Sequence, residues 1–151
     1  MGDRQTAIEA HIQKDPFANY LGANVEILAP GHSRVSLTVT ENLLNFHGTT
    51  HGGIVFCVGD IAFAAAGNSR GQTAVALNMT ISFLRVTEAG DTLVAEAKER
   101  ALNGPIGLYN ITVVEQKNGE LVAQIQAMIY RKPAQAHKGS CAATGRANGL
   151  A

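Results

Sequence analysis

The most constraining feature of the sequence is an apolar stretch at residues 51–69, HGGIVFCVGDIAFAAAGNS. It is rich in alanine and carries a single charge, Asp60, at its middle. At about 1.5 Å per residue it would form a helix roughly 28 Å long, enough to cross a small domain. The run is shorter than the ~20 apolar residues that a bilayer requires, and it has a carboxylate at its centre. A helix that is apolar on all sides must be buried inside another structure, so we expect it at the centre of the fold.

Asp60 has no partner of opposite charge on this helix. The residues one turn away are Phe56, Cys57, Phe63 and Ala64, so no Lys or Arg is available for an i±4 ion pair. Burial of an unpaired carboxylate costs several kcal/mol or forces it to protonate. Two interpretations are open at this point: the acid caps a loop or meets a distant arginine, or it is a catalytic acid in a dry cleft.

The start of the helix offers hydrogen-bond donors. Gly52 and Gly53 follow His51, so the first turn carries backbone amides with little side-chain cover. Unpaired amides at a helix start, with the helix dipole behind them, suit a carbonyl oxygen that is gaining negative charge. This feature favours the catalytic interpretation of Asp60.

The distance between the helix start and Asp60 requires a second copy of the chain. Asp60 follows Gly53 by seven residues, so the two lie on nearly the same face but roughly 10 Å apart along the axis. They can act on one substrate carbon only if two antiparallel helices lie side by side across a two-fold axis. The same face carries Cys57, Ala64 and Gly67, which are small enough for close approach. We therefore predict an obligate homodimer with two composite sites.

Composition excludes several classes of protein. A chain of 151 residues suits one domain, and a hydrophobic content of 46% is ample for a core. Lys plus Arg equals Asp plus Glu, at 12 each, so no nucleic-acid partner is expected. The N-terminus lacks the apolar region of a signal peptide, and Cys57 and Cys141 form no CxxC motif. These features favour a reducing cytoplasm and no membrane association.

The rest of the chain predicts an α+β fold. Helices are expected at residues 4–14 and 16–21, the second between Asp15 as cap and Gly22. In the segment after the long helix, alternation places Val75, Leu77, Met79, Ile81 and Phe83 on one face. Strands are expected at residues 23–29, 33–40, 73–87, 92–101, 106–116 and 121–131.

This order of elements fits one curved antiparallel sheet wrapped around a long central helix. We expect a single domain over residues 1–132. Residues 133–151 are small and polar without periodicity, so we expect a poorly ordered tail.

The residues around the long helix form an extended motif, Asn45-x5-His51-Gly52-Gly53-x6-Asp60, continued by DxAFAxAxNS up to Ser69. With this motif the chain resembles the hotdog-fold acyl-CoA thioesterases of the PaaI type, the phenylacetic acid degradation thioesterase family. The segments ISFLR, AGDTLVAEA and GLYNITVVEQ extend the similarity over about residues 15–132. HGG alone is a weak signal, but HGG with the preceding Asn, the following Asp and the NS at the helix end is specific.

The resemblance implies hydrolysis of acyl-CoA, of aromatic phenylacetyl type, by a homodimer that commonly pairs into a homotetramer. The Gly52 amide would polarise the thioester carbonyl, with Gly53 beside it. Asp60 of the neighbouring subunit would be the nucleophile or the base that activates water. Asn45 would hold the water or the thioester end, and His51 would orient the loop. No cofactor is required because a thioester is already activated, and an aspartate near its reference pKa of ~3.9 is ionised at neutral pH.

Some relatives use a polar residue on the strand after the helix, and that position is Ala76 here. Asn78 or Thr50 could take its place. Arg85 is a candidate for the phosphates of CoA, although solvated surface charge is the simpler interpretation. His47 and His51 are four residues apart, but Gly48 and the absence of a third ligand argue against a metal site.

Two other functions use the same residues differently. A non-catalytic acyl-CoA-binding protein of the same fold would bind the thioester without hydrolysis. A hydratase or dehydratase would require a His and acid pair poised for proton transfer at carbon, and His51 is poorly placed for that chemistry.

Overall fold

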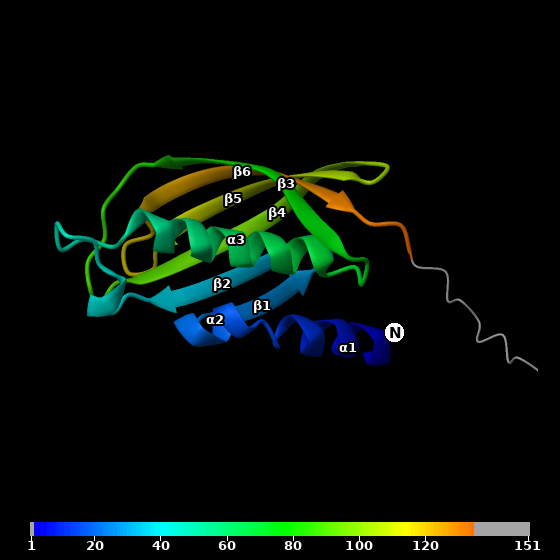
Figure 1. Cartoon of the computed structure of the whole chain (residues 1–151), viewed down its shortest axis with the longest axis horizontal. Coiled ribbons are helices and arrows are strands. Elements are labelled where there is room, and N and C mark those ends of the chain that lie inside the picture. Colours follow the sequence, from blue (N-terminus) through cyan, green and yellow to red (C-terminus); the bar gives the residue numbers. More distant parts are fainter. Residues whose placement is uncertain (1, 135–151) are drawn as a thin grey trace, which may run out of the picture.

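The computed structural model describes residues 2–134, in which a curved antiparallel sheet wraps around helix α3, Gly52–Asn68 (Figure 1). The helix occupies the predicted stretch, with His51 as N-cap and Ser69 as C-cap. One side of α3 packs on the sheet, whereas the opposite side is only partly covered within one chain. The residues of α3 that become buried are Val55, Val58, Gly59, Ile61, Ala62, Phe63, Ala65, Ala66 and Gly67.

Two short helices, α1 (Gly2–Ile12) and α2 (Pro16–Leu21), precede the sheet. The predicted cap at Asp15 is confirmed, because its Oδ1 accepts hydrogen bonds from the Phe17 and Ala18 amides. Gly22 ends α2 with a φ of 72°, a left-handed conformation that glycine adopts without strain.

The six strands lie in the order β1-β2-β4-β5-β6-β3, and every neighbouring pair is antiparallel. The predicted α+β hotdog architecture is confirmed. The strand predicted at residues 73–87 is shorter than expected and ends at Phe83. The strands are β1 (Asn24–Ala29), β2 (His32–Thr38), β3 (Ala74–Phe83), β4 (Thr92–Asn103), β5 (Ile106–Glu115) and β6 (Leu121–Arg131), and a short 3-10 helix, η1 (Glu41–Leu43), leads from β2 toward α3.

Strand β3 departs from simple alternation at Leu77, which is an extra residue with no partner in β6. A bulge of this kind shifts the alternation of side chains by one position. The prediction that Val75 shares one face with Met79, Ile81 and Phe83 is therefore wrong. Val75 points away from α3, whereas the last three keep the predicted inward face.

The C-terminal end of α3 is tied to the sheet by two serines. The Ser69 hydroxyl donates to the Ala66 carbonyl and accepts from the Gly31 amide, both at 2.7 Å. The buried Ser33 hydroxyl donates to the Ala62 carbonyl at 2.6 Å. The Ser69 bond satisfies a carbonyl of the last turn of α3, and together these bonds fix the helix against β2 and the β1–β2 turn.

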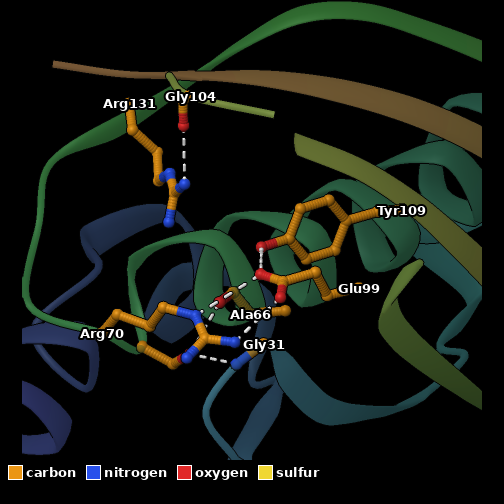
Figure 2. A network of polar contacts seen from close by, with 8 residues as sticks. Gly31, Ala66, Arg70, Glu99, Gly104, Tyr109 and Arg131 are labelled. Carbon is orange, nitrogen blue, oxygen red and sulfur yellow. Dashed lines mark hydrogen bonds and ion pairs between the residues drawn. The ribbon is translucent and has the colours of Figure 1, made fainter. Parts of the chain in front are cut away.

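A network around Glu99 holds the same end of the helix (Figure 2). Its carboxylate accepts from Arg70 Nη2 and from the Tyr109 hydroxyl, both at 2.8 Å. Burial would raise the pKa of Glu99, but the hydrogen bonds from Arg70 and Tyr109 outweigh it and hold the pKa below its ordinary value. Arg131 lies beside the network and donates to the Gly104 carbonyl. The end of α3 is therefore held in one position.

Gly59 marks the closest approach of α3 to the sheet. A Cβ at this position would overlap the Cδ1 atom of Ile125, a fully buried side chain in β6. We expect Gly59→Ala to lower the free energy of unfolding by about 1–3 kcal/mol, because an extra methyl group overpacks a close-packed core. Chemical denaturation would measure the change.

Gly67→Ala is the matched control for this prediction. A Cβ at Gly67 would have its nearest neighbour, Ile129 Cδ1, at 3.5 Å, an ordinary contact. Alanine is the better helix former, so this variant should be neutral or more stable. Equal stability of the two variants would contradict the close contact at Gly59.

The predicted tail at residues 133–151 lies almost wholly outside the described residues, as does Cys141. Among the helices at residues 2–134, none is long and apolar enough to cross a membrane.

Candidate active site

The Gly52 amide is an unused hydrogen-bond donor at the start of α3. Among the described residues, no hydrogen bond is donated by Gly52 N, whereas Gly53 N donates to His51 Nδ1 at 2.9 Å. The next amide, Ile54 N, donates to the His51 carbonyl at 2.8 Å. A Cβ built on Gly52 would lie 3.4 Å from the Phe83 ring, so this ring lies beside the free amide. Of the two predicted glycine amides, Gly52 is the one available to a carbonyl oxygen.

His51 caps the helix and fixes its start. Because Nδ1 accepts from Gly53, the neutral ring carries its proton on Nε2. His51 N donates to the Leu43 carbonyl at 2.9 Å, and Thr50 N donates to the Thr87 carbonyl at 2.8 Å. The buried Thr50 hydroxyl also accepts from Thr87 Oγ1 at 2.7 Å. These contacts hold the Gly52 amide in place.

Asn45 organises the loop that precedes the helix. Its Oδ1 accepts from the His47 and Thr49 amides at 2.9 and 3.3 Å, and its Nδ2 donates to Thr49 Oγ1 at 3.0 Å. Gly48 has a φ of 81°, which completes the tight turn. The side chain of Phe46 projects from this turn with an exposed fraction of 93%. Within one chain, Asn45 therefore positions the loop.

The partly covered side of α3 carries Asp60 among small residues. Asp60 is half-buried, and Gly53 and Ala64 on the same side are exposed. Within residues 2–134, Asp60 receives no hydrogen bond and forms no ion pair, so the interpretation as a capping or arginine-paired acid finds no partner there. The prediction that Gly67 lies on the Asp60 face, open to a second helix, is wrong, because Gly67 is buried and packs on the sheet.

The pKa of Asp60 is raised above its ordinary value, first by burial and then by the negative charge of Asp15. The expectation that Asp60 has a pKa near its reference value is therefore wrong, because the pKa is raised. The structure brings together Asp15, at the start of α2, and Asp60, in the middle of α3. Sequence reasoning identified Asp15 only as a helix cap, because nothing local reports which elements pack against each other.

Two other predicted site residues lie away from this face. Asn78 lies on the outer face of the sheet, where it lines a shallow pocket with Thr80 and Gln126, on the side away from its own α3. Arg85 follows β3 and forms an exposed ion pair with Glu120 at 3.0 Å. From the outer face of the sheet, Asn78 could reach a site on α3 only through another subunit.

No group of three or more His, Cys, Asp or Glu side chains could hold a metal ion in the part of the chain that the structure describes. At α3 the structure offers an amide donor at the helix start and a half-buried carboxylate at the middle of the helix. An amide of this kind stabilises an oxyanion, and a carboxylate of this kind acts as a base or a nucleophile.

Comparison with known proteins identifies the family of this chain. Residues 47–122, about half of the chain, match the family model of the thioesterase superfamily. The acyl-coenzyme A thioesterase PaaI of Escherichia coli (strain K12) is 43% identical over 108 residues, which cover 72% of this chain and 77% of that protein.

Solved structures give the same result. The E. coli PaaI protein from the phenylacetic acid degradation operon superposes with a TM-score of 0.79 at 39% identity, over 83% of this chain and 90% of that one. A Streptococcus mutans UA159 protein bound to acetyl CoA superposes with a TM-score of 0.69 at 25% identity, over 73% and 88% of the two chains. The chain therefore belongs to the thioesterase superfamily and is a thioester hydrolase with the hotdog fold.

Proposed function

We propose that this protein hydrolyses acyl-CoA thioesters with aromatic, phenylacetyl-type acyl groups, as part of phenylacetate catabolism in the cytoplasm. The observation that carries the proposal is that α3 bears both an unused Gly52 amide and a half-buried Asp60 without a hydrogen-bond or ion-pair partner among the described residues. The similarity to the E. coli thioesterase PaaI supports acyl-CoA as the substrate class.

In the proposed mechanism, the thioester carbonyl accepts a hydrogen bond from the Gly52 amide of one subunit. Asp60 of the partner subunit then either removes a proton from the attacking water or attacks the carbonyl carbon itself. The oxyanion that forms is stabilised by the amide and by the start of the helix. When water attacks, collapse of the oxyanion breaks the C–S bond, the free acid forms, and CoA leaves as the thiol with the proton that Asp60 took from water. When Asp60 attacks, the same bond breaks and leaves an anhydride between Asp60 and the acyl group; water then hydrolyses this anhydride, which releases the acid, restores Asp60 and supplies the proton of the thiol. Asn45 and His51 keep the loop and the amide in position.

The site requires a homodimer, because Gly52 and Asp60 of one chain lie eight residues apart on the same helix, about 12 Å along its axis. The side of α3 that would meet a second copy is exposed at Gly53 and Ala64. The edge strand β3 also exposes Leu77 and Phe83, at 54% and 56%. An unprotected apolar edge strand supports pairing with another chain. We propose a dimer that pairs further into a homotetramer.

The proposal is tested by following CoA release with a thiol reagent. Phenylacetyl-CoA, hydroxybenzoyl-CoA and straight-chain acyl-CoAs would be compared by kcat/KM, with the aryl substrates expected to react fastest. Saturable binding of all of these thioesters without CoA release would instead support the non-catalytic binding protein. Faster turnover of straight chains would contradict the aryl specificity alone.

The pH profile of kcat/KM should show the raised pKa of Asp60. Only the ionised carboxylate can act as base or nucleophile, so activity should rise with pH through the pKa of Asp60. Because burial and Asp15 raise this pKa, the midpoint of the acidic limb should lie above the ordinary aspartate value of about 3.9. A midpoint at or below that value would contradict a desolvated Asp60.

A further inference from the structure

A groove of about 420 Å³ lies between the N-terminal helices and the second half of α3. Its walls come from α1, the start of α2, β1 and α3. Most of its lining is apolar, and its polar residues are His11, Lys14, Asp15 and Asn68. The apolar lining consists of Ile12, Pro16, Val25, Ile61, Ala64 and Ala65.

Asp60 does not line the groove, but two of its neighbours on α3 do. Ile61 is the next residue in α3 and Ala64 is one helical turn further on, so both lie close to the carboxylate. Asp15, at the other wall, is close enough for its charge to act on Asp60. From Ile61 to Asn68 the groove follows α3 for seven residues, roughly 10 Å. A group attached to a carbonyl at Asp60 could therefore extend along it.

The α3 wall of the groove offers little to a polar ligand. Asn68 is its polar residue, and the hydrogen bonds of this side chain are already made. Its Nδ2 donates to the Ala64 and Ala74 carbonyls, and its Oδ1 accepts from the Ala74 amide. Lys14 and Asp15 carry opposite charges on the far wall. This lining suits an apolar, uncharged ligand group.

We propose that this groove holds the acyl part of the thioester and that Ile12, on α1, determines which acyl groups fit. The proposal rests on the proposed function and names its acyl pocket. The match to the thioesterase superfamily begins at residue 47, so α1 and α2 lie outside the matched region. The wall that sets selectivity is thus supplied by a part of the chain that the family model does not describe.

The test fills or enlarges the groove at one position. Ile12→Trp should lower the ratio of kcat/KM for phenylacetyl-CoA to that for acetyl-CoA by at least ~10-fold, because a small volume change in an apolar pocket has effects of this size. Ile12→Ala should raise kcat/KM for bulkier acyl-CoAs relative to kcat/KM for acetyl-CoA. Octanoyl-CoA, compared in the same way, distinguishes a straight chain from an aromatic ring as the preferred occupant.

Ile8 provides the matched control on the same helix. It lies one turn before Ile12, packs against Gly71, and is not part of the groove lining. Ile8→Trp and Ile8→Ala should leave the substrate ratios unchanged. Equal shifts for the Ile8 and Ile12 variants, or no shift for Ile12→Trp, would overturn the proposal.

Binding provides a readout that does not depend on hydrolysis. In an Asp60→Asn background, calorimetry should show that Ile12→Trp weakens binding of phenylacetyl-CoA by ~10-fold or more relative to acetyl-CoA. If this shift occurs in a protein whose native form releases no CoA, the groove is supported and the hydrolase proposal fails. If turnover is normal but neither ratio shifts, the groove proposal alone fails.

Discussion

Replacement of Asp60 by Asn should reduce the rate of CoA release by about 10²- to 10⁴-fold, the range expected when a general base is removed. Asparagine has nearly the same shape but no charge, so it can neither accept the proton of water nor attack the carbonyl as a carboxylate. The loss should appear in kcat, with KM for phenylacetyl-CoA little changed, because the substrate still binds. Steady-state kinetics of CoA release would measure both constants.

The same substitution should not destabilise the protein. The pKa of Asp60 is raised on folding, so its ionised form is less favourable in the folded state, and the carboxylate lowers stability at neutral pH. Thermal unfolding of Asp60→Asn should therefore give an unchanged or higher Tm. Asp91→Asn is a suitable control, because Asp91 accepts a turn hydrogen bond from the Glu88 amide that asparagine also accepts. Full turnover by Asp60→Asn would disprove the assignment.

The second large effect is expected from mixing two inactive variants. Gly52→Pro removes the free amide, and proline suits the first position of a helix because no helical bond is lost there. His51, with φ −61° and ψ 132°, has the extended conformation that a residue before proline requires. Neither Gly52→Pro nor Asp60→Asn should release CoA at a useful rate alone.

Co-expression of these two variants at equal levels should recover about one quarter of wild-type activity. A composite site is intact only when an unaltered Gly52 meets an unaltered Asp60 from the partner subunit, which random assortment gives about one time in four. Gly52→Ala is the control, because it keeps the amide and adds a Cβ at ordinary contact distance, 3.4 Å, from Phe83. No recovery on mixing would show that the two residues do not meet between subunits.

Much of the fold follows from local patterns. The apolar stretch at residues 51–69 predicted the central helix, and the cap at Asp15 with Gly22 predicted α2. These features are visible because a helix cap or an apolar run depends only on neighbouring residues. The glycine pair and Asp60 were likewise visible as a candidate site before any tertiary structure.

Other features depend on contacts between distant residues. The bulge at Leu77 changes the register with β6, and the alternating pattern of β3 does not reveal it. The ion pair of Glu99 with Arg70 joins residues 29 apart in the sequence. The approach of Asp15 to Asp60 depends on how the N-terminal segment packs, with α1 on α3 and α2 on β1. The expectation of an ordinary pKa for Asp60 was wrong for this reason, because burial and the charge of Asp15 raise its pKa above the reference value.

In the proposed dimer, the segment of α3 between Gly52 and Asp60 also fixes the separation of the two reaction centres. Each centre combines the start of one helix with the middle of the other, so the centres are about 12 Å apart along the shared axis. The helix is held at its start by His51 and at its end by Ser69, which keeps this spacing constant. Any substitution that bends or rotates this segment would disturb both centres together, so the two cannot be altered independently.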